Sequence, residues 1–476
     1  MRRLSGLDSA FLALETPHST GHVGGLSVLD PSTAPTPIDL ARLHRLYAER
    51  VPLVPVMRQR LVQLPLGLDQ PFWADDPDFD LAYHLREVAL PAPGDDTLLA
   101  EQVARIHERP LDRSRPLWET YLITGLRDGR LGLYIKIHHA AFDGVSGTDL
   151  LTVLMDLSPD GRDLPPAPAW RPDPLPGSVQ LGLRAARGVV LRPVEAAKIV
   201  ADTARALPRL GPALAPWVGR SLHPATAGAE VIDTTTGRPP TTPLNRTITP
   251  HRRFGFASLS LDDVKTVKNA FGVTVNDVVM ALSAGVLRSW LEERDALPEH
   301  PLVAMVPVSI RDESSAHAEG NRVSAMLAQV PTHLADPVAR LRLSHEATLH
   351  AKGQQAVLPQ ELFDEVTDFA PPVLTNTVFR MVFGSHLLNR LPAFNVVISN
   401  IPGPSIPVYF CGARLLAHYP LSVVTDGLGL NITVISYLGH MDFGLIADRD
   451  TVPDVEVMAR HLHDELDILL AAAADA

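Results

Sequence analysis

The sequence predicts an α/β protein with more than one domain. Stretches with the two-residue period of strands alternate along the chain with stretches that carry the longer period of helices. At 476 residues the chain is too long for one ordinary hydrophobic core. Its content of 46% hydrophobic and 20% charged residues is that of a globular protein. We expect strands at 131–139, 254–260, 303–308, 395–400, 430–437 and 442–447, and helices at 100–108, 147–157, 261–270, 275–292 and 454–471.

A proline-rich stretch divides the chain. Residues 158–178, SPDGRDLPPAPAWRPDPLPGS, are typical of an extended linker. The helical stretch at 179–220 carries seven Lys or Arg against two Asp or Glu. It either rests on an anionic lipid surface or connects the domains and covers their interface with its arginines. We therefore expect an N-terminal domain at 1–157, a linker with basic helices at 158–245, and a C-terminal domain at 246–476.

Composition limits the classes of function. The net charge of −12 argues against a general affinity for nucleic acid. Cys411 is the single cysteine, so an intrachain disulfide is impossible and a reducing interior is expected. The chain has neither a signal-peptide core near its start nor an apolar run long enough to span a membrane. We expect a cytoplasmic protein whose contact with membranes or lipid inclusions, if it makes any, is peripheral.

The stretch at 131–139 predicts a half-buried strand that ends in two histidines. Apolar positions alternate with others over Leu131, Gly132, Leu133, Tyr134, Ile135, Lys136 and Ile137. The alternation places His139 on the apolar face and His138 on the opposite one. Burial disfavours the protonated form of an imidazole, so His139 is a candidate general base.

A turn with a carboxylate follows the two histidines in IKIHHAAFDGVSG. Asp143 could orient the ring of His139 or hold the turn by pairing with an arginine, and Gly144 tolerates conformations that other residues resist. No serine elbow of the G-x-S-x-G type is present. Adjacent strand residues face opposite ways, so His138 and His139 are not expected to bind a metal. From these residues alone, a structural histidine pair remains the alternative to a catalytic one.

The stretch GVTVNDVVMALSAGVLRSW supplies a second candidate site. Thr274 and Asp277 have the spacing of a capping box at the start of a helix. Asn276 therefore lies in the first turn, beside unpaired backbone N–H groups and the positive end of the helix dipole. Such a position can stabilise an oxyanion. The alternative is that Asn276 and Asp277 only cap the helix.

Several motifs together resemble those of one enzyme family. HHAAFDG matches the HHxxxDG pattern of the CoA-dependent acyltransferases. PLDRSRPLWE at 110–119, PLNRTITPHRRF at 243–254, VVISNIPGP at 396–404 and the long stretch at 426–448 resemble bacterial wax ester synthase/diacylglycerol acyltransferases (WS/DGAT). The matches span nearly the whole chain. The resemblance implies two lobes similar to chloramphenicol acetyltransferase, with mixed sheets and a tunnel between them.

The resemblance also implies a reaction. His139 would take a proton from the hydroxyl of a diacylglycerol or long-chain alcohol, whose oxygen then attacks a fatty acyl-CoA directly. The products would be triacylglycerol or wax esters, with acyl-CoA as co-substrate and no further cofactor. His138 and Gly144 would complete the motif, and Asp143 would support it by pairing with Arg311.

Two other functions remain open at this stage. One is a condensation-domain-like acyltransferase, against which the absence of an attached carrier domain counts. The other is a non-catalytic coat protein of lipid inclusions, against which the intact HHxxxDG motif counts. The preferred acceptor, the acyl chain length and the oligomeric state cannot be predicted from the sequence.

Overall fold

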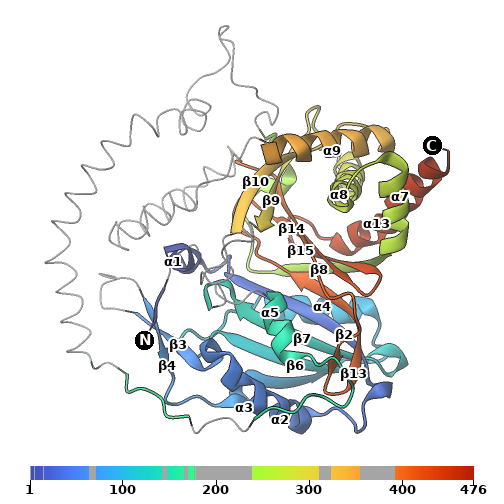
Figure 1. Ribbon diagram of the computed structural model, residues 1–476. Helices are drawn as coiled ribbons and strands as arrows, with labels where there is room; N and C mark the ends of the chain where they lie inside the picture. Colours follow the sequence, from blue (N-terminus) through green and yellow to red (C-terminus); the bar gives the residue numbers. More distant parts are fainter. Residues whose placement is uncertain are drawn as a thin grey trace, which may run out of the picture.

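The computed structural model describes most of the two predicted domains. The described residues are 2–4, 6–13, 15–63, 71–141, 147–165, 170–175, 177, 239–309, 323–353 and 392–475. The basic stretch at 179–220, Asp143, Gly144 and Arg311 lie outside them. The structure has two lobes, each built on a six-stranded mixed sheet (Figure 1). This confirms the predicted α/β class.

The first sheet combines strands from both ends of the chain. Its strand order is β12, β13, β2, β7, β6, β5. The bounds are β2 His22–Asp30, β5 Leu85–Ala89, β6 Trp118–Thr124, β7 Leu131–His138, β12 Tyr409–Phe410 and β13 Ala413–Leu421. All neighbours are antiparallel except β5 and β6. A small sheet of β1 Arg2–Arg3, β4 Phe72–Asp75 and β3 Gln59–Val62 lies in the same lobe.

Helices bury both faces of the first sheet. Leu99 and Val103 of α4 (Asp96–His107) pack in one apolar cluster with Tyr134 of β7. The opposite face packs against α2 (Leu40–Arg50) and α5 (Gly147–Leu154), in a cluster that holds Leu133 and Ile135. Every β7 residue from 132 to 138 is buried. The prediction of a half-buried strand is therefore wrong, because Lys136 occupies a buried position that its charge does not suggest.

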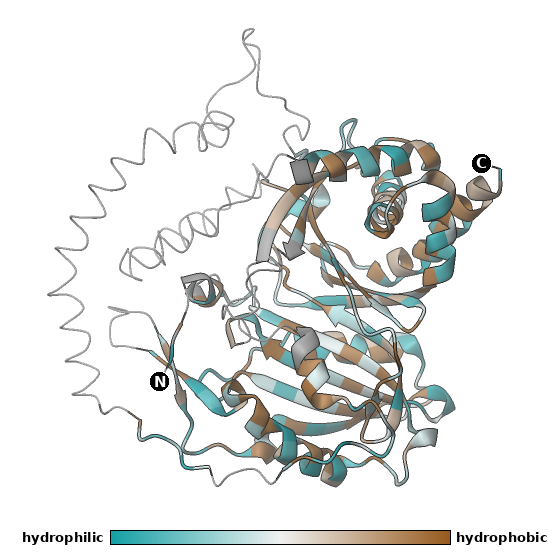
Figure 2. Cartoon of the chain, viewed as in Figure 1, coloured by the Kyte–Doolittle hydropathy of each residue, from teal (hydrophilic) through white to brown (hydrophobic). Residues whose placement is uncertain are grey.

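The second sheet carries its helices on one side. The strand order is β10, β9, β11, β14, β15, β8. The strands are β8 Arg252–Ser260, β9 Leu302–Ser309, β10 Val323–Val330, β11 Val396–Ile401, β14 Leu430–Tyr437 and β15 His440–Asp448. The helices are α7 Leu261–Phe271, α8 Val275–Glu292, α9 Pro337–Gly353 and α13 Val455–Ala474. Apolar residues recur along the strands of both sheets (Figure 2). Helix α8 is buried on all sides from 277 to 287, as an internal helix must be.

Most predicted elements are confirmed within a few residues. The strands predicted at 254–260, 303–308, 395–400, 430–437 and 442–447 correspond to β8, β9, β11, β14 and β15. The helices predicted at 100–108, 147–157, 261–270, 275–292 and 454–471 correspond to α4, α5, α7, α8 and α13. Strand β7 ends at His138, and His139 begins a short 3₁₀ turn, η6 (His139–Ala141). The described parts of 158–178 contain no helix or strand.

No single described helix is long and apolar enough to cross a lipid bilayer. Helices α7 and α8 meet that length and composition only as a pair, with a bend of 101° between them.

The two lobes are joined where the chain passes from the second sheet to the first and back. After β11 in the second lobe, the chain enters the first sheet as β12 and β13, where β13 pairs with β2, and then returns as β14. The carboxylate of Asp442 on β15 accepts a hydrogen bond from the amide of His418 on β13 (2.8 Å). A Cβ atom on Gly444 would overlap the carbonyl oxygen of Pro420. Strands β13 and β15 thus cross in close contact.

Replacing Gly444 with Ala should destabilise the junction between the lobes. The added methyl group would meet backbone atoms of Pro420, which cannot move without disturbing β13. Overpacking of this kind costs about 1–3 kcal/mol of unfolding free energy. Chemical denaturation of Gly444→Ala and Gly177→Ala would measure it, since a Cβ on Gly177 meets nothing within 4 Å. Equal stability of the two variants would contradict the close crossing.

Candidate active site

His139 lies at the end of β7, between the N-terminal segment and the first sheet. Its backbone amide donates a hydrogen bond to the carbonyl of Gly21 (2.8 Å). The ring of Phe11, from α1 (Gly6–Ala13), stacks on the His139 imidazole with ring centroids 4.0 Å apart. Its Nδ1 atom is buried, and no other described residue offers it a hydrogen-bond partner. The residue as a whole remains partly exposed. Phe11 therefore holds the ring in place, while the Nδ1 atom has no hydrogen-bond partner among the other described residues.

The imidazole of His139 is neutral at ordinary pH. Burial lowers the pKa of His139 from its usual value near 6.5 to about 4. The desolvation expected from the sequence is thus present, although His139 follows the strand rather than lying within it. A neutral imidazole can accept a proton from a hydroxyl group.

His138 fixes the start of the turn that carries His139. Its Nδ1 atom accepts a hydrogen bond from the amide of Ala140 (3.1 Å), so this nitrogen carries no proton. The proton is on Nε2, which donates to the carboxylate Oε1 of Glu15 (2.9 Å). The side chain is buried. His138 is therefore a positioning residue, and its ring nitrogens are both occupied.

Glu15 links the N-terminal segment to the end of β7. The same Oε1 atom accepts from the amide of Gly21 (3.0 Å), and Arg113 pairs with the other oxygen. Burial alone would raise the pKa of Glu15, but the hydrogen bond from His138 and the charge of Arg113 outweigh it and lower the pKa to about 2. Glu15 is a carboxylate at all working pH values. Our sequence analysis missed it, although a charged residue directly after the apolar stretch AFLAL was a signal.

A buried cluster of imidazoles lies behind His138. His22 pairs with His138 across the sheet, and their ring centroids are 5.9 Å apart. Burial, together with the charge of Lys136, lowers the pKa of both His22 and His107 well below the ordinary value. The Lys136 ammonium donates to the carbonyls of Ile106 (2.9 Å) and Arg109 at the end of α4. Cations are favoured at this end of a helix dipole, so Lys136 anchors α4 to β7.

Among the described residues, no hydrogen bond, ion pair or ring contact joins Asn276 or Asp277 to His139. Thr274 and Asp277 form the predicted capping box of α8. Asp277 also accepts from His345 Nδ1 (2.7 Å), which ties α8 to α9. Burial alone would raise the pKa of Asp277, and the hydrogen bonds from His345 and Thr274 lower it overall. Asn276 is partly exposed, and none of the described residues forms a hydrogen bond with its side chain.

Asp143, Gly144 and Arg311 lie outside the described residues, so their roles remain predictions.

Within the described ranges, no group of three or more His, Cys, Asp or Glu side chains is placed to hold a metal ion. Trp118, in the stretch PLDRSRPLWE, lies in the core: it is buried, and its indole donates to the carbonyl of Met57 (2.8 Å).

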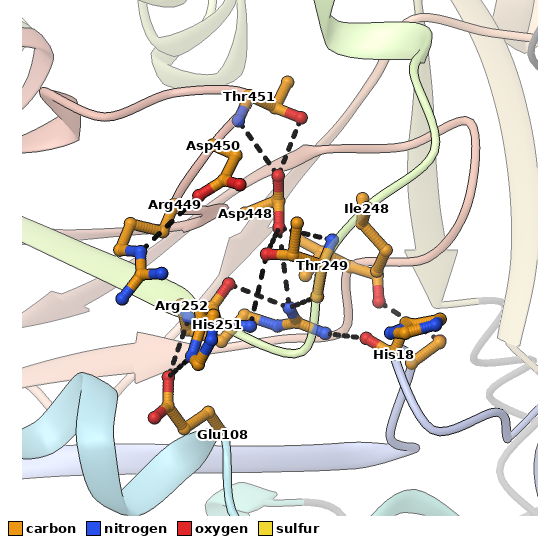
Figure 3. A network of polar contacts seen from close by, with 12 residues as sticks. His18, Glu108, Ile248, Thr249, His251, Arg252, Asp448, Arg449, Asp450 and Thr451 are labelled. Atoms are coloured by element: carbon orange, nitrogen blue, oxygen red, sulfur yellow. Dashed lines mark hydrogen bonds and ion pairs between the residues drawn. The ribbon is translucent and has the colours of Figure 1, made fainter.

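A polar network ties the N-terminal segment to the second lobe (Figure 3). The buried Arg252 guanidinium donates to the carbonyls of His18 (2.5 Å) and Thr249 (2.6 Å). Asp448 accepts from Thr249 and Thr451 through both its oxygens. The segment that carries His18 also supplies Glu15 and Gly21 to the two motif histidines. The position of His139 is therefore coupled to the junction between the lobes.

Comparison with known proteins shows the family. A model of the wax ester synthase/diacylglycerol acyltransferase catalytic domain matches residues 4–279, and a model of the WS/DGAT C-terminal domain matches residues 319–470. A provisionally named diacylglycerol O-acyltransferase of Mycobacterium tuberculosis, Rv1760, is 36% identical over 100% of this chain and 91% of its own length.

Solved structures give the same result. The wax ester synthase/diacylglycerol acyltransferase from Marinobacter aquaeolei VT8 is 31% identical, covers 99% of this chain and 100% of its own, and has a TM-score of 0.70. The starter condensation domain of rhizomide synthetase, solved with C8-CoA and Leu-SNAC, shares the fold at 13% identity, covering 100% of this chain and 95% of its own with a TM-score of 0.54. The chain belongs to the wax ester synthase/diacylglycerol acyltransferase family and is an acyltransferase.

Proposed function

We propose that this enzyme moves a long-chain fatty acyl group from CoA to the hydroxyl of a diacylglycerol or a long-chain alcohol, with His139 as the general base. The observation that supports this most strongly is the state of His139. It is a neutral imidazole at the end of β7, in a member of an acyltransferase family, and no other described residue is a hydrogen-bond partner of its buried Nδ1. The names of the relatives point to both acceptors.

The proposed transfer proceeds in one direct exchange. His139 accepts the proton of the acceptor hydroxyl as its oxygen attacks the thioester carbonyl carbon, and a tetrahedral intermediate forms. When the intermediate collapses, the C–S bond breaks and the proton on His139 passes to the departing CoA sulfur. An ester and free CoA result, and His139 is neutral again. No covalent acyl-enzyme is required.

Three contacts position the base. Phe11 stacks on the ring, the carbonyl of Gly21 holds the backbone amide, and the pair of Glu15 and His138 fixes the preceding residue. Correct placement of a base can raise the reaction rate by several powers of ten, because the reacting atoms are already close and correctly oriented. Each contact comes from the N-terminal segment at 11–21, so this segment belongs to the proposed site.

Other parts of the proposal rest on the family resemblance. Asn276, at the first turn of α8, would stabilise the oxyanion of the intermediate, with Asp277 as the cap that holds it. A tunnel between the lobes would exclude water, so that a lipid hydroxyl and not hydroxide receives the acyl group. A peripheral position on a membrane or a lipid inclusion would supply the acceptor. Incubation with labelled palmitoyl-CoA and both acceptors in parallel would identify the preferred one.

Replacing His139 with Ala should abolish acyl transfer. General base catalysis contributes about a hundredfold to ten-thousandfold in rate, so turnover should fall at least a hundredfold. His18→Ala is the matched control, because His18 is exposed and its hydrogen bonds use only the backbone. Ester formation from labelled palmitoyl-CoA measures the effect. Full activity of His139→Ala would show that His139 is not the general base.

The activity should stay nearly constant from about pH 8 down to about pH 5. His139 has a pKa of about 4, so it remains an acceptor over this range and is protonated only as the pH falls through that value. The pH dependence of kcat/KM, recorded with circular dichroism at each pH, tests this. Loss of half the activity near pH 6.5, the ordinary histidine value, would show that the base is not the buried imidazole described here.

Glu15→Ala should lower kcat by about tenfold to a hundredfold with little change in KM. Without the carboxylate, His138 Nε2 loses its partner and the turn at His139 is no longer fixed. Glu15→Gln should restore most of the rate, because its amide oxygen can still accept from His138 and from the Gly21 amide. Steady-state kinetics and thermal melts of both variants measure this. If Gln were as damaging as Ala at equal stability, the positioning role would be wrong.

A further inference from the structure

A pocket lined by arginines lies beside α4, where the two lobes meet. A pocket of about 430 Å³ opens between the second half of α4, the start of β8, the residue after β15 and the first turn of α13. Five of its lining residues are arginines: Arg105, Arg109, Arg252, Arg253 and Arg449. We refer to it as the arginine pocket. Three glutamates also line it, yet the balance is positive in a chain whose net charge is −12.

Most of these charges are already matched. Arg105 and Arg253 pair with Glu101 (3.4 and 3.9 Å), and Arg253 also pairs with Glu456 (3.3 Å). Arg252 is turned into the interior by the network around Asp448. These three arginines and their partners therefore form the structural frame of the pocket.

Two arginines of the pocket are not matched in this way. Arg109, just after α4, is exposed and has no carboxylate partner among the described residues. Arg449, just after β15, makes one ion pair, with Asp450 at 3.5 Å, and both side chains are about half exposed. Pairs this exposed contribute little energy. One arginine comes from each lobe, and both line the same pocket.

The glutamate nearest to them is occupied. The Glu108 carboxylate accepts from the backbone amide of Arg252 (3.0 Å) and lies 3.5 Å from His251 Nδ1. Figure 3 shows Glu108 and Arg449 approaching the His251–Arg252 stretch from different elements. Glu108 is thus committed to joining α4 to β8, and it does not neutralise Arg109 and Arg449.

We propose that the arginine pocket binds a phosphate ester, held between Arg109 and Arg449. The planar guanidinium groups match phosphate oxygens and form two hydrogen bonds at once, which suits them to such ligands. The phosphates can belong to CoA or to the headgroup of an anionic phospholipid. Assigning them to CoA rests on the proposed function, whereas the phosphate site itself does not.

The position of the pocket connects it to the catalytic segment. Arg252, in the wall of the pocket, donates to the carbonyl of His18, and the same segment holds the His139 amide through Gly21. The carbonyl of Arg109 accepts from Lys136 on β7, two residues before His138. A ligand that draws Arg109 and Arg449 together would therefore tighten the junction beside the motif histidines.

The test compares charge-removing variants with a matched control. Arg109→Gln and Arg449→Gln each remove one of the two arginines, and Arg127→Gln removes an exposed arginine in the turn at the other end of α4. Calorimetry with CoA and with 3′-dephospho-CoA forms the coenzyme arm. Binding to phosphatidylcholine vesicles with and without phosphatidate forms the lipid arm. Melting curves establish that all variants are folded.

Each pocket variant should weaken binding in one arm about tenfold, since a hydrogen bond to a charged group is worth about that factor. Arg127→Gln should leave binding unchanged. An effect confined to CoA, and smaller for the dephospho form, identifies the coenzyme; an effect confined to phosphatidate identifies the lipid. Unchanged affinity in both arms for both variants would overturn the proposal. The measurements are repeated in the His139→Ala background, so binding that persists without transfer separates this site from the proposed reaction.

Discussion

The hydrogen bond between Glu15 and His138 is the contact on which the geometry of the site depends. Removing a carboxylate from water destabilises the fold unless the carboxylate is paired. The largely buried Glu15 is paired with His138, the Gly21 amide and Arg113. The bond also sets the tautomer of His138, whose other nitrogen then accepts from Ala140. Because both ring nitrogens of His138 are held by hydrogen bonds, the backbone conformation at His139, between His138 and Ala140, is fixed.

The junction between the lobes extends this constraint across the molecule. The N-terminal segment that carries Glu15 is held from the other lobe by Arg252, and the first sheet is completed by β13 from the C-terminal half. Because hydrogen bonds from the second lobe hold the segment that carries Glu15, changes in either lobe can reach His139.

Local periodicity predicted much of the fold. It failed where strand pairing or burial depends on residues far apart in the sequence. Strands β14 and β15 and the capped helix α8 depend on neighbouring residues, and all three were predicted. The place of β13 in the first sheet depends on pairing with β2, nearly 400 residues away, which no local pattern records. Lys136 misled the burial prediction for the same reason, because its partners are carbonyls of α4. HHxxxDG located the candidate base, whereas Glu15 emerged only from the three-dimensional contacts.

The state of its ring nitrogens distinguishes His139 from the buried histidines beside it. In His22, Nδ1 faces the carbonyl of His107 and Nε2 accepts from the amide of Leu111, so both nitrogens are used. His138 is occupied in the same way. Burial alone lowers the pKa of a histidine whether it is structural or catalytic, so a low pKa does not identify a base. A general base must leave one position for the proton that it takes, and no other described residue occupies His139 Nδ1. His84 Nε2 is likewise buried without a partner, so the place of His139 as the second histidine of HHxxxDG is what singles it out.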